Sequence, residues 1–437
     1  MRLPKSLSNI AIFFIPSAVT ETGCQALRAS VQIVKVIDNL YGGQYCLFMH
    51  MIPREVEKII QDQLQGFPII TITGPRQSGK TTLARAVFPR KPYFSLEDPD
   101  VRQLALDDPR GFLAQAPDGA VLDEVQRAPE ILSYLQTHVD RDGRMGLFLL
   151  TGSQHFGLMS EITQSLAGRT SFIELLPFSV QELHNGQIMP SDLDTMLFNG
   201  GYPPLYDRAL SPHSWFPAYV TAYIERDVRQ LLKVQDLETF QQFLRLCAGR
   251  SGQLLNLSSL AADCGITHNT AKAWISVLEA SYILFQLRPH HNNFRKRLVK
   301  SPKIYFYDTG LLCRLLGLQE AGQLTTHPLR GSIFETFVVA ELMKARFNRL
   351  INTGFYFWRD SKGHEIDLIA DYGGRLMPIE IKSGQTLNRD FFKNLEYWLG
   401  LAGDTSLSPT LVYGGTKSAH RHGIKVVGWD NCSEILK

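Results

Sequence analysis

The sequence predicts an α/β fold in which a parallel sheet carries the ligand site, and two observations support this prediction. The first is the stretch Phe67–Leu83, where an apolar, β-branched run breaks at a glycine-rich loop and restarts as a helix. The second is a series of short apolar segments that alternate with helical stretches, at Tyr93–Leu96, Ala120–Leu122, Leu147–Leu150 and Phe172–Leu175. Such alternation calls for parallel strands with right-handed crossovers, so ligand chemistry is expected at the carboxyl ends of the strands.

The composition is that of an ordinary folded protein with several domains. The chain has 437 residues, 44% of them hydrophobic and 20% charged. The net charge of +3 is too close to balance to indicate a nucleic-acid partner by itself. Six scattered cysteines without a C-x-x-C pair fit a reducing compartment. No apolar run approaches the length that spans a bilayer, so we expect a soluble cytoplasmic protein without a membrane partner.

The glycine-rich loop has the pattern G-x-x-x-x-G-K-T, which is typical of phosphate binding. Its glycines let backbone N–H groups approach the phosphates, Lys80 neutralises the β- and γ-oxygens, and the Thr81 hydroxyl ligates Mg²⁺ at a helix N-terminus. A chance match is made improbable by the strand and helix that flank the loop. We therefore predict ATP and Mg²⁺ as ligands, with GTP as the alternative nucleotide, bound by Gly74, Pro75, Arg76, Gln77, Ser78, Gly79, Lys80, Thr81 and Thr82.

Two acids end the third predicted strand. Asp123 is the expected partner of Thr81 around Mg²⁺, and Glu124 is placed to orient or deprotonate the attacking water. The alternative is a pair of acids that merely caps a strand end.

Polar residues also follow the fourth strand. Ser153 or Gln154 is a candidate sensor of the γ-phosphate, with a plain turn as the alternative. Arg169 is a candidate for stabilising transition-state charge, either within its own chain or in a neighbouring subunit of a homo-oligomer. An ordinary solvated arginine is the alternative.

Residues 1–50 do not continue the α/β pattern. Arg2 and Lys5 precede an apolar run that resembles a signal peptide, but Pro16 interrupts it and no small-residue cleavage site follows closely. We expect a start assigned too far upstream, with Met51 as the beginning, or else a poorly ordered extension.

A helix-turn-helix pattern follows a helical lid or connector at residues 201–236. Asn256–Cys264 forms one helix, Gly265 the turn, and Thr267 caps a second helix to about Ala280. A strand at Tyr282–Leu287 then begins a wing. The segment between Ala280 and Tyr307 has no acid, and we expect it to bind nucleic-acid phosphates through Arg295, Lys296, Arg297, Lys300 and Lys303. Docking of a protein is the alternative.

The last segment places acids and a lysine on a hairpin. Period-two alternation puts Glu365 and Asp367 on one face of the strand Gly363–Ala370. Glu380 and Lys382 likewise share a face of the strand Met377–Gly384, and these groups can hold Mg²⁺. From the hairpin alone, a solvated charged face is the favoured interpretation.

A series of motifs along the chain resembles one known family. They are Gly74–Thr81, Ala120–Glu130, Leu149–Gln154, Ser165–Arg169, Leu175–Ser179, Tyr223–Val228, Pro302–Leu311, Phe355–Ile369 and Ile379–Gly384. From Met51 onward the chain resembles the bacterial and archaeal AAA+-like ATPases whose C-terminal part is the domain of unknown function DUF4143.

The resemblance implies a C-terminal PD-(D/E)XK restriction-endonuclease-like fold. Its metal ligands then fall on Glu335, Asp367 and Glu380, and its catalytic lysine on Lys382. Many relatives of that fold bind without cutting, so cleavage stays open.

We therefore expect an ATPase whose nucleotide cycle controls a winged-helix and nuclease-like module acting on DNA or RNA. The rival hypothesis is a nucleotide-dependent switch or scaffold whose C-terminal modules dock partner proteins. The expected segments are the extension 1–50, the ATPase core 51–200, the lid 201–236, the winged helix 237–305, a linker 306–330 and the nuclease-like domain 331–437.

Overall fold

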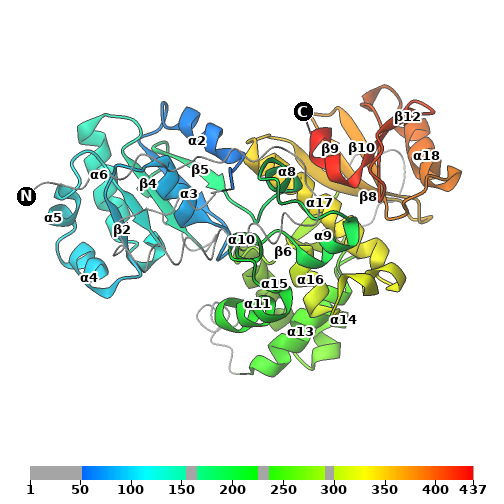
Figure 1. The fold of residues 1–437 in the computed structure, drawn as a ribbon, viewed down its shortest axis with the longest axis horizontal. Coiled ribbons are helices and arrows are strands. Elements are labelled where there is room, and N and C mark those ends of the chain that lie inside the picture. Colours follow the sequence, from blue (N-terminus) through cyan, green and yellow to red (C-terminus); the bar gives the residue numbers. More distant parts are fainter. Residues whose placement is uncertain (1–51, 154–164, 225–235, 291–299, 437) are drawn as a thin grey trace, which may run out of the picture. The chain divides into compact units, whose positions relative to one another are not determined.

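The computed structural model describes residues 52–153, 165–224, 236–290 and 300–436 (Figure 1). Several predictions made from the sequence lie outside these ranges. They concern the extension 1–50, the candidate phosphate sensor Gln154, and the basic residues Arg295, Lys296 and Arg297.

The first half of the described chain forms the expected parallel sheet. Its five strands have the order β2-β3-β4-β1-β5, and every neighbouring pair is parallel. The strands are β1 (Ile69–Thr73), β2 (Tyr93–Ser95), β3 (Val121–Asp123), β4 (Phe148–Gly152) and β5 (Thr170–Glu174). Strands β1, β3 and β4 are buried at every position. Strands that are buried on both faces have nearly continuous apolar sequences, which makes them recognisable from the sequence.

Helices cover both faces of this sheet. Ile70 and Ile72 of β1 pack in a core with residues of α2 (Val56–Gln63) and α3 (Lys80–Val87). Ile69 belongs to a second core, with residues of α4 (Pro99–Asp107), α5 (Pro109–Ala114) and α6 (Ile131–Asp142). A 3₁₀ turn, η1 (Val125–Arg127), follows β3.

The strand order decides which loops meet. Strand β4 pairs with both β1 and β3 and therefore lies between them. The loop after β1 and the acids after β3 thus flank the end of β4, where Ser153 stands. This end of the sheet brings together the nucleotide loop, Asp123, Glu124 and Ser153.

A helical region follows the sheet. It contains α8 (Val180–Asn185), α9 (Leu193–Asn199), α10 (Pro203–Asp207), α11 (Pro212–Tyr219) and a π-helical turn, η2 (Val220–Ile224). Beyond the undescribed residues 225–235 come α13 (Leu237–Gly249), α14 (Leu257–Cys264) and α15 (His268–Ala280).

Helices α14 and α15 form the expected helix-turn-helix. Asn256 and Thr267 cap the two helices through their side chains, and Gly265 makes the turn with φ of 65°. Strands β6 (Leu284–Pro289) and β7 (Lys303–Phe306) then pair in antiparallel fashion.

The second sheet differs from the expected division into domains. Strand β6 also pairs with β8 (Gly354–Arg359), so the β6–β7 ladder extends the C-terminal sheet. This sheet has eight strands in the order β12-β13-β11-β10-β9-β8-β6-β7. Its other strands are β9 (Glu365–Asp371), β10 (Leu376–Lys382), β11 (Thr410–Tyr413), β12 (Ala419–Arg421) and β13 (Ile424–Gly428). The expected boundary around residues 306–330 therefore does not separate two sheets.

Helices complete the C-terminal part. They are α16 (Thr309–Leu315), α17 (Arg330–Asn348) and α18 (Lys393–Ala402), with 3₁₀ turns η3 (Ala321–Thr326), η4 (Arg389–Phe392), η5 (Gly403–Thr405) and η6 (Trp429–Ile435). One continuous hydrophobic core includes residues from Leu176 to Leu436. Residues of the lid, the helix-turn-helix and the C-terminal sheet all contribute to that core.

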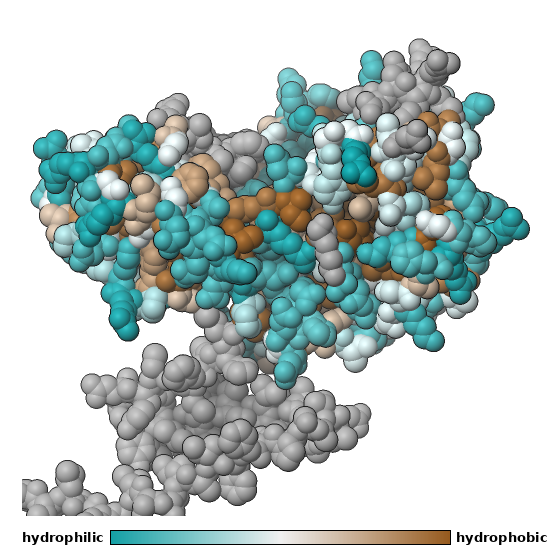
Figure 2. Space-filling model, turned by 90° about the horizontal axis from the view of Figure 1, so that it is seen from above, coloured by the Kyte–Doolittle hydropathy of each residue, from teal (hydrophilic) through white to brown (hydrophobic). Residues whose placement is uncertain are grey.

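One face of the molecule is mostly polar. Figure 2 shows a face on which hydrophilic side chains surround smaller hydrophobic patches. Among the residues that the structure describes, no helix combines the length and apolar character needed to cross a membrane.

Candidate nucleotide site and carboxylate centre

The glycine-rich loop joins β1 to α3 and requires glycine at both ends. At Gly74, φ is 148°, and a Cβ atom would lie 2.1 Å from the carbonyl oxygen of Leu175. Gly79 has φ of 93° and stands immediately before α3. Lys80 and Thr81 thus occupy the first turn of a helix, where backbone N–H groups point outward and favour a bound anion.

Lys80 lies within the loop and is 5% exposed. Its ammonium donates to the carbonyl oxygens of Gly74 at 3.0 Å and Pro75 at 2.7 Å. Ser78 is fully buried, and its hydroxyl has no hydrogen-bond partner among the described residues. The loop thus offers a buried hydroxyl without a hydrogen-bond partner among the described residues and an ammonium that is fixed in place. A phosphate oxygen could accept from both groups, so the loop fits a nucleotide.

Three further residues of the predicted nucleotide loop are Arg76, Gln77 and Thr82. Gln77 has a positive φ of 62°. Arg76 is nearly buried, with its guanidinium 4.0 Å from Glu97. Thr82 is exposed on α3. Their contacts with nucleotide stay predictions.

Asp123 and Thr81 meet at the end of β3. The Thr81 hydroxyl lies 3.1 Å from both carboxylate oxygens of Asp123. Tyr93 donates to Asp123 at 2.6 Å, and the Thr151 hydroxyl also donates to it. Burial and the neighbouring Asp123 carboxylate raise the pKa of Tyr93 to about 12, so the phenol stays a donor. The expected pair of magnesium ligands is thus brought together, and Tyr93 and Thr151 position its carboxylate.

Glu124 follows with a left-handed backbone conformation, φ of 58°. Its carboxylate accepts hydrogen bonds from Gln126 and, at 3.2 Å, from the Ser153 hydroxyl. Its backbone N–H donates to the Thr151 hydroxyl at 3.2 Å. A non-glycine residue at positive φ is strained and common at functional sites. The geometry therefore joins Glu124 and Ser153, which the sequence had nominated separately.

Arg169 lies at the amino ends of the strands, opposite the nucleotide loop. In the register of β1 with β5, Ile69 pairs with Thr170 and Thr73 with Glu174, so Arg169 precedes the strand whose far end adjoins the loop. A strand of this length spans roughly 15 Å. The guanidinium also forms a paired contact with Asp140 at 2.5 and 2.8 Å. The expectation that Arg169 acts on nucleotide in its own chain is therefore wrong, and a role toward a neighbouring subunit stays a prediction.

One residue that sequence reasoning missed holds the loop from outside. Arg54 donates to the carbonyl oxygens of Ser78 and Leu176, each at 2.7 Å, and to the carboxylate of Glu182 at 2.9 Å. Arg54 and Glu182 are both buried. A single arginine at this position belongs to no recognisable sequence pattern, because its partners lie up to 128 residues away.

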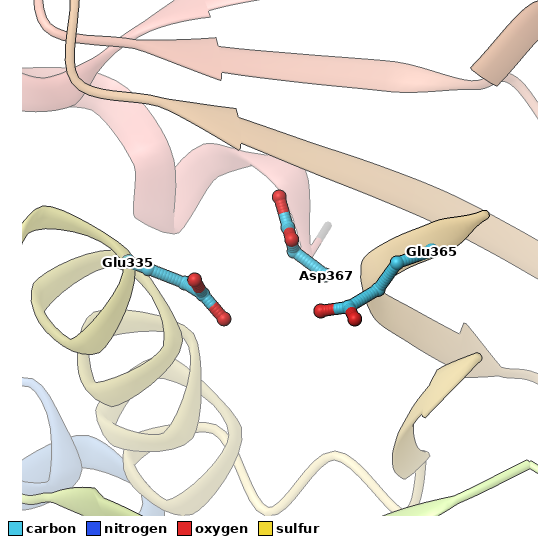
Figure 3. Close-up of side chains that lie close together, drawn as sticks. All are labelled: Glu335, Glu365 and Asp367. Atoms are coloured by element: carbon cyan, nitrogen blue, oxygen red, sulfur yellow. The ribbon is translucent and has the colours of Figure 1, made fainter. Parts of the chain in front are cut away.

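A cluster of carboxylates forms the second site, in the C-terminal part. Carboxylate oxygens of Glu335, Glu365 and Asp367 lie within 4.8 Å of one another. Figure 3 shows the three side chains extending from α17 and β9 toward a common space. Glu365 was placed on this face by alternation but was not among the predicted metal ligands.

Glu380 and Lys382 adjoin this cluster from β10. The Lys382 ammonium donates to Glu380 at 2.6 Å and lies 4.0 Å from Asp367. Asn394 donates to the same Glu380 oxygen at 2.9 Å. The backbone N–H of Ile381 donates to Asp367 at 2.8 Å. All four residues implied by the resemblance therefore gather in one place, with Glu365 as a fifth member.

Burial dominates the electrostatics of this centre. It raises the pKa of Glu335 to about 7, against the opposing pull of Lys303, and it raises the pKa of Glu380 to about 8 with help from Asp367. Burial would lower the pKa of Lys382, but Asp367 and Glu380 raise it above its ordinary value. The ammonium therefore stays charged.

The prediction that Lys303 belongs to an exposed basic wing is wrong. Its side chain is 3% exposed and donates to Glu335 at 2.8 Å, with Glu365 as a second partner. A buried ammonium held by two carboxylates is not available to a phosphate backbone. Lys300 is exposed, and its contact with nucleic acid stays a prediction.

Family models match most of the described chain in sequence. The model of an AAA domain matches residues 66–184, a domain of unknown function (DUF8612) matches residues 190–322, and a domain of unknown function (DUF4143) matches residues 330–431.

Curated relatives and solved structures add to these matches. The uncharacterized proteins Rv2008c of Mycobacterium tuberculosis and Mb2031c of Mycobacterium bovis are each 33% identical over 338 residues, covering 76% of this chain and 74% of theirs. The Walker-type ATPase of Pyrococcus abyssi is 16% identical, with 61% of this chain and 96% of that chain covered and a TM-score of 0.43. A signal-transduction ATPase of Pyrococcus horikoshii with a tetratricopeptide-repeat sensor is 11% identical, with 69% and 48% covered and a TM-score of 0.25. Neither structure is close enough to carry a functional comparison.

The chain therefore belongs to the same family as these mycobacterial proteins, and its domain matches identify it as an AAA-like P-loop ATPase with a C-terminal DUF4143 domain.

Proposed function

We propose that the protein hydrolyses ATP with Mg²⁺ and that this cycle acts on a winged-helix and nuclease-like part directed at nucleic acid. The observation that carries the first half is the pairing of Thr81 with Asp123, with Glu124 next in sequence. When bound, Mg²⁺ would be held by these two side chains and would neutralise phosphate oxygens.

The roles of the chain's own residues follow from their positions. Lys80 neutralises phosphate charge, and the Ser78 hydroxyl and the first N–H groups of α3 donate to phosphate oxygens. Glu124 accepts the proton of the attacking water, while Ser153 and Gln126 hold its carboxylate in place. Tyr93 and Thr151 fix the carboxylate of Asp123.

The nuclease-like half of the proposal rests on the carboxylate centre. Glu380 is 1% exposed, and its Oε2 atom has no hydrogen-bond partner among the described residues. A buried carboxylate oxygen without a partner, close to Asp367, suits a hard divalent cation. Asp367 and Glu380 would hold the ion, and Lys382 would stabilise negative charge on a phosphate group.

Nucleic acid is the partner best supported by the helix-turn-helix. His268, Asn269 and Lys272 are exposed on the first turns of α15, the second helix of that motif. Exposed basic and amide groups at this place can contact phosphates and base edges. The rival, a switch that only docks proteins, differs by lacking both nucleic-acid binding and cleavage.

Mg²⁺-dependent ATP turnover by the purified chain, with and without a panel of DNA and RNA, tests the proposal. Lys80→Ala should lose nucleotide binding, because a phosphate charge loses its partner. Lys91→Ala is the matched control, since Lys91 donates to the carbonyl oxygens of Gly146 and Leu147 away from the loop. A chain that turns over no ATP, or a Lys80→Ala variant that hydrolyses normally, would refute the ATPase assignment.

A further inference from the structure

A lysine already lies among the carboxylates of the C-terminal centre. Lys303, the first residue of β7, places its ammonium 2.8 Å from Glu335 and in contact with Glu365. Tyr305, two residues along the same strand, donates to the same Glu335 oxygen at 2.6 Å. The ammonium is thus fixed by a short, buried strand and not by a flexible surface loop.

This ammonium competes for the space that a metal ion would need. The oxygens of Glu335, Glu365 and Asp367 are spaced closely enough to share one cation. Two of these three carboxylates already contact the Lys303 ammonium. A metal ion among these carboxylates would lie close to the Lys303 ammonium, and two positive charges repel strongly in a buried site. A metal ion and the Lys303 ammonium therefore exclude each other among Glu335, Glu365 and Asp367.

The other side of the centre, at Asp367 and Glu380, is not occupied by a buried ammonium from the part of the chain that the structure describes. Four carboxylates, from Glu335, Glu365, Asp367 and Glu380, face the two ammonium groups of Lys303 and Lys382. Arg359 approaches only the outer side, 3.3 Å from Glu365, and is 40% exposed. Of the two ammonium groups, Asp367 and Glu380 face only that of Lys382, whose side chain is 33% exposed against 3% for Lys303, and the Oε2 atom of Glu380 has no hydrogen-bond partner among the described residues.

We propose that Lys303 takes the place of a second divalent cation, so that the centre binds one such ion, between Asp367 and Glu380, and not two. The inference rests on the proposed function, which supplies the metal. In this proposal the Lys303 ammonium permanently neutralises Glu335 and Glu365. The nuclease-like site therefore binds one exchangeable metal ion.

Calorimetric titration of the full chain with Mn²⁺, without nucleotide, tests the stoichiometry. The wild type should bind one ion that Asp367→Asn abolishes. Lys303→Met, which keeps most of the length of the side chain and removes its charge, should bind one ion more than the wild type. Lys303→Arg keeps the charge and should bind the same number as the wild type.

Thermal melting provides a second readout that does not depend on activity. Lys303→Met should melt below the wild type and regain several degrees with Mn²⁺, because the ion replaces the lost ammonium. Lys344→Met is the matched control. Lys344 is equally buried on α17 and is paired with Glu341 at 2.7 Å, outside the centre. Its loss should lower the melting temperature without any added response to Mn²⁺.

The outcomes separate the inference from the function on which it rests. An unchanged ion count and affinity in Lys303→Met, or two Asp367-dependent ions in the wild type, would overturn the inference and leave the metal site standing. A wild type with no Asp367-dependent ion would overturn both. If Lys303→Met unfolds in buffer, refolding on addition of Mn²⁺ supports the inference. Failure to refold, with Lys303→Arg folded normally, contradicts it.

Discussion

The hydroxyl of Tyr282 lies 2.9 Å from the hydroxyl of Thr73, the last residue of the strand that leads into the nucleotide loop. The same phenol donates to Glu174 at 3.2 Å, at the end of the neighbouring strand β5. Tyr282 follows helix α15 with a positive φ of 56°. The helix-turn-helix part thus contacts the ATPase sheet one residue before its phosphate loop, which gives a direct physical connection between the two.

Replacing Tyr282 by phenylalanine tests that connection. Tyr282→Phe should lower the free energy of unfolding by about 1 kcal/mol, because buried polar groups lose a partner. It should also reduce the change in ATP turnover that nucleic acid causes, since the contact next to the loop is gone. Denaturant unfolding and ATPase assays with and without DNA measure the two effects.

Tyr397→Phe is a suitable comparison. It removes a similar bond, from Tyr397 on α18 to Asp360 at 3.2 Å. That variant should keep the full response of turnover to nucleic acid. Equal responses in all three proteins would show that Tyr282 is structural only.

Glu124→Gln should separate binding from hydrolysis. The amide keeps the shape of the side chain and can still contact Ser153, so ATP affinity should change less than threefold. Turnover should fall by about 10²–10⁴-fold, the usual contribution of a general base. Equilibrium binding of ATP and steady-state phosphate release test the two halves.

A neighbouring acid is the control for Glu124. Glu97, near Arg76 and Arg127, is half exposed and is not expected to contact the attacking water. Glu97→Gln should hydrolyse ATP at nearly the wild-type rate. If Glu124→Gln did so too, the base would have to be sought elsewhere at this edge of the sheet.

Arg54 should be among the most sensitive positions for stability. Arg54→Ala leaves the fully buried carboxylate of Glu182 without its guanidinium, which costs about 3–5 kcal/mol. It also frees the carbonyl of Ser78, so nucleotide affinity should fall as well. Unfolding by urea and ATP titration of the folded fraction measure these changes.

The double variant Arg54→Ala with Glu182→Gln provides the check. Removing the uncompensated charge should restore part of the stability but not the nucleotide affinity, because the Ser78 carbonyl still lacks its donor. Recovery of both would mean that Arg54 acts on the loop only through global stability.

Sequence patterns predicted the features that depend on residues close together in the sequence. The loop from Gly74 to Thr81 is predictable because its chemistry is set by adjacent residues, and the cap at Thr267 because it depends on the residues beside it. Arg54, Tyr282 and Lys303 were missed or misassigned since their partners lie far along the chain. Lys303 shows this most clearly, because an acid-free stretch predicted an exposed cation and tertiary pairing with α17 and β9 buries it.

The basic segment before Lys303 is expected to bind nucleic-acid phosphates without it. Each phosphate contact releases condensed counterion and contributes a slope of about −0.9 to the plot of log affinity against log salt concentration. With Lys303 excluded and only part of the segment engaged, a slope of about −3 is expected on duplex DNA. Changing Arg295, Lys296 and Arg297 together to alanine should flatten that slope and leave ATP turnover without nucleic acid unchanged.

Lys303→Met makes this prediction specific. If Lys303 belongs to the carboxylate centre, this variant should bind DNA with the wild-type salt slope, whereas loss of a phosphate contact at Lys303 would reduce the magnitude of the slope by about 0.9. Fluorescence anisotropy between about 50 and 200 mM salt gives the slopes, because the range spans a large change in counterion release. Little preference among sequences is expected, since the exposed His268, Asn269 and Lys272 offer few groups that discriminate bases. Binding that ignores both salt and the triple substitution would instead favour the docking of a protein partner.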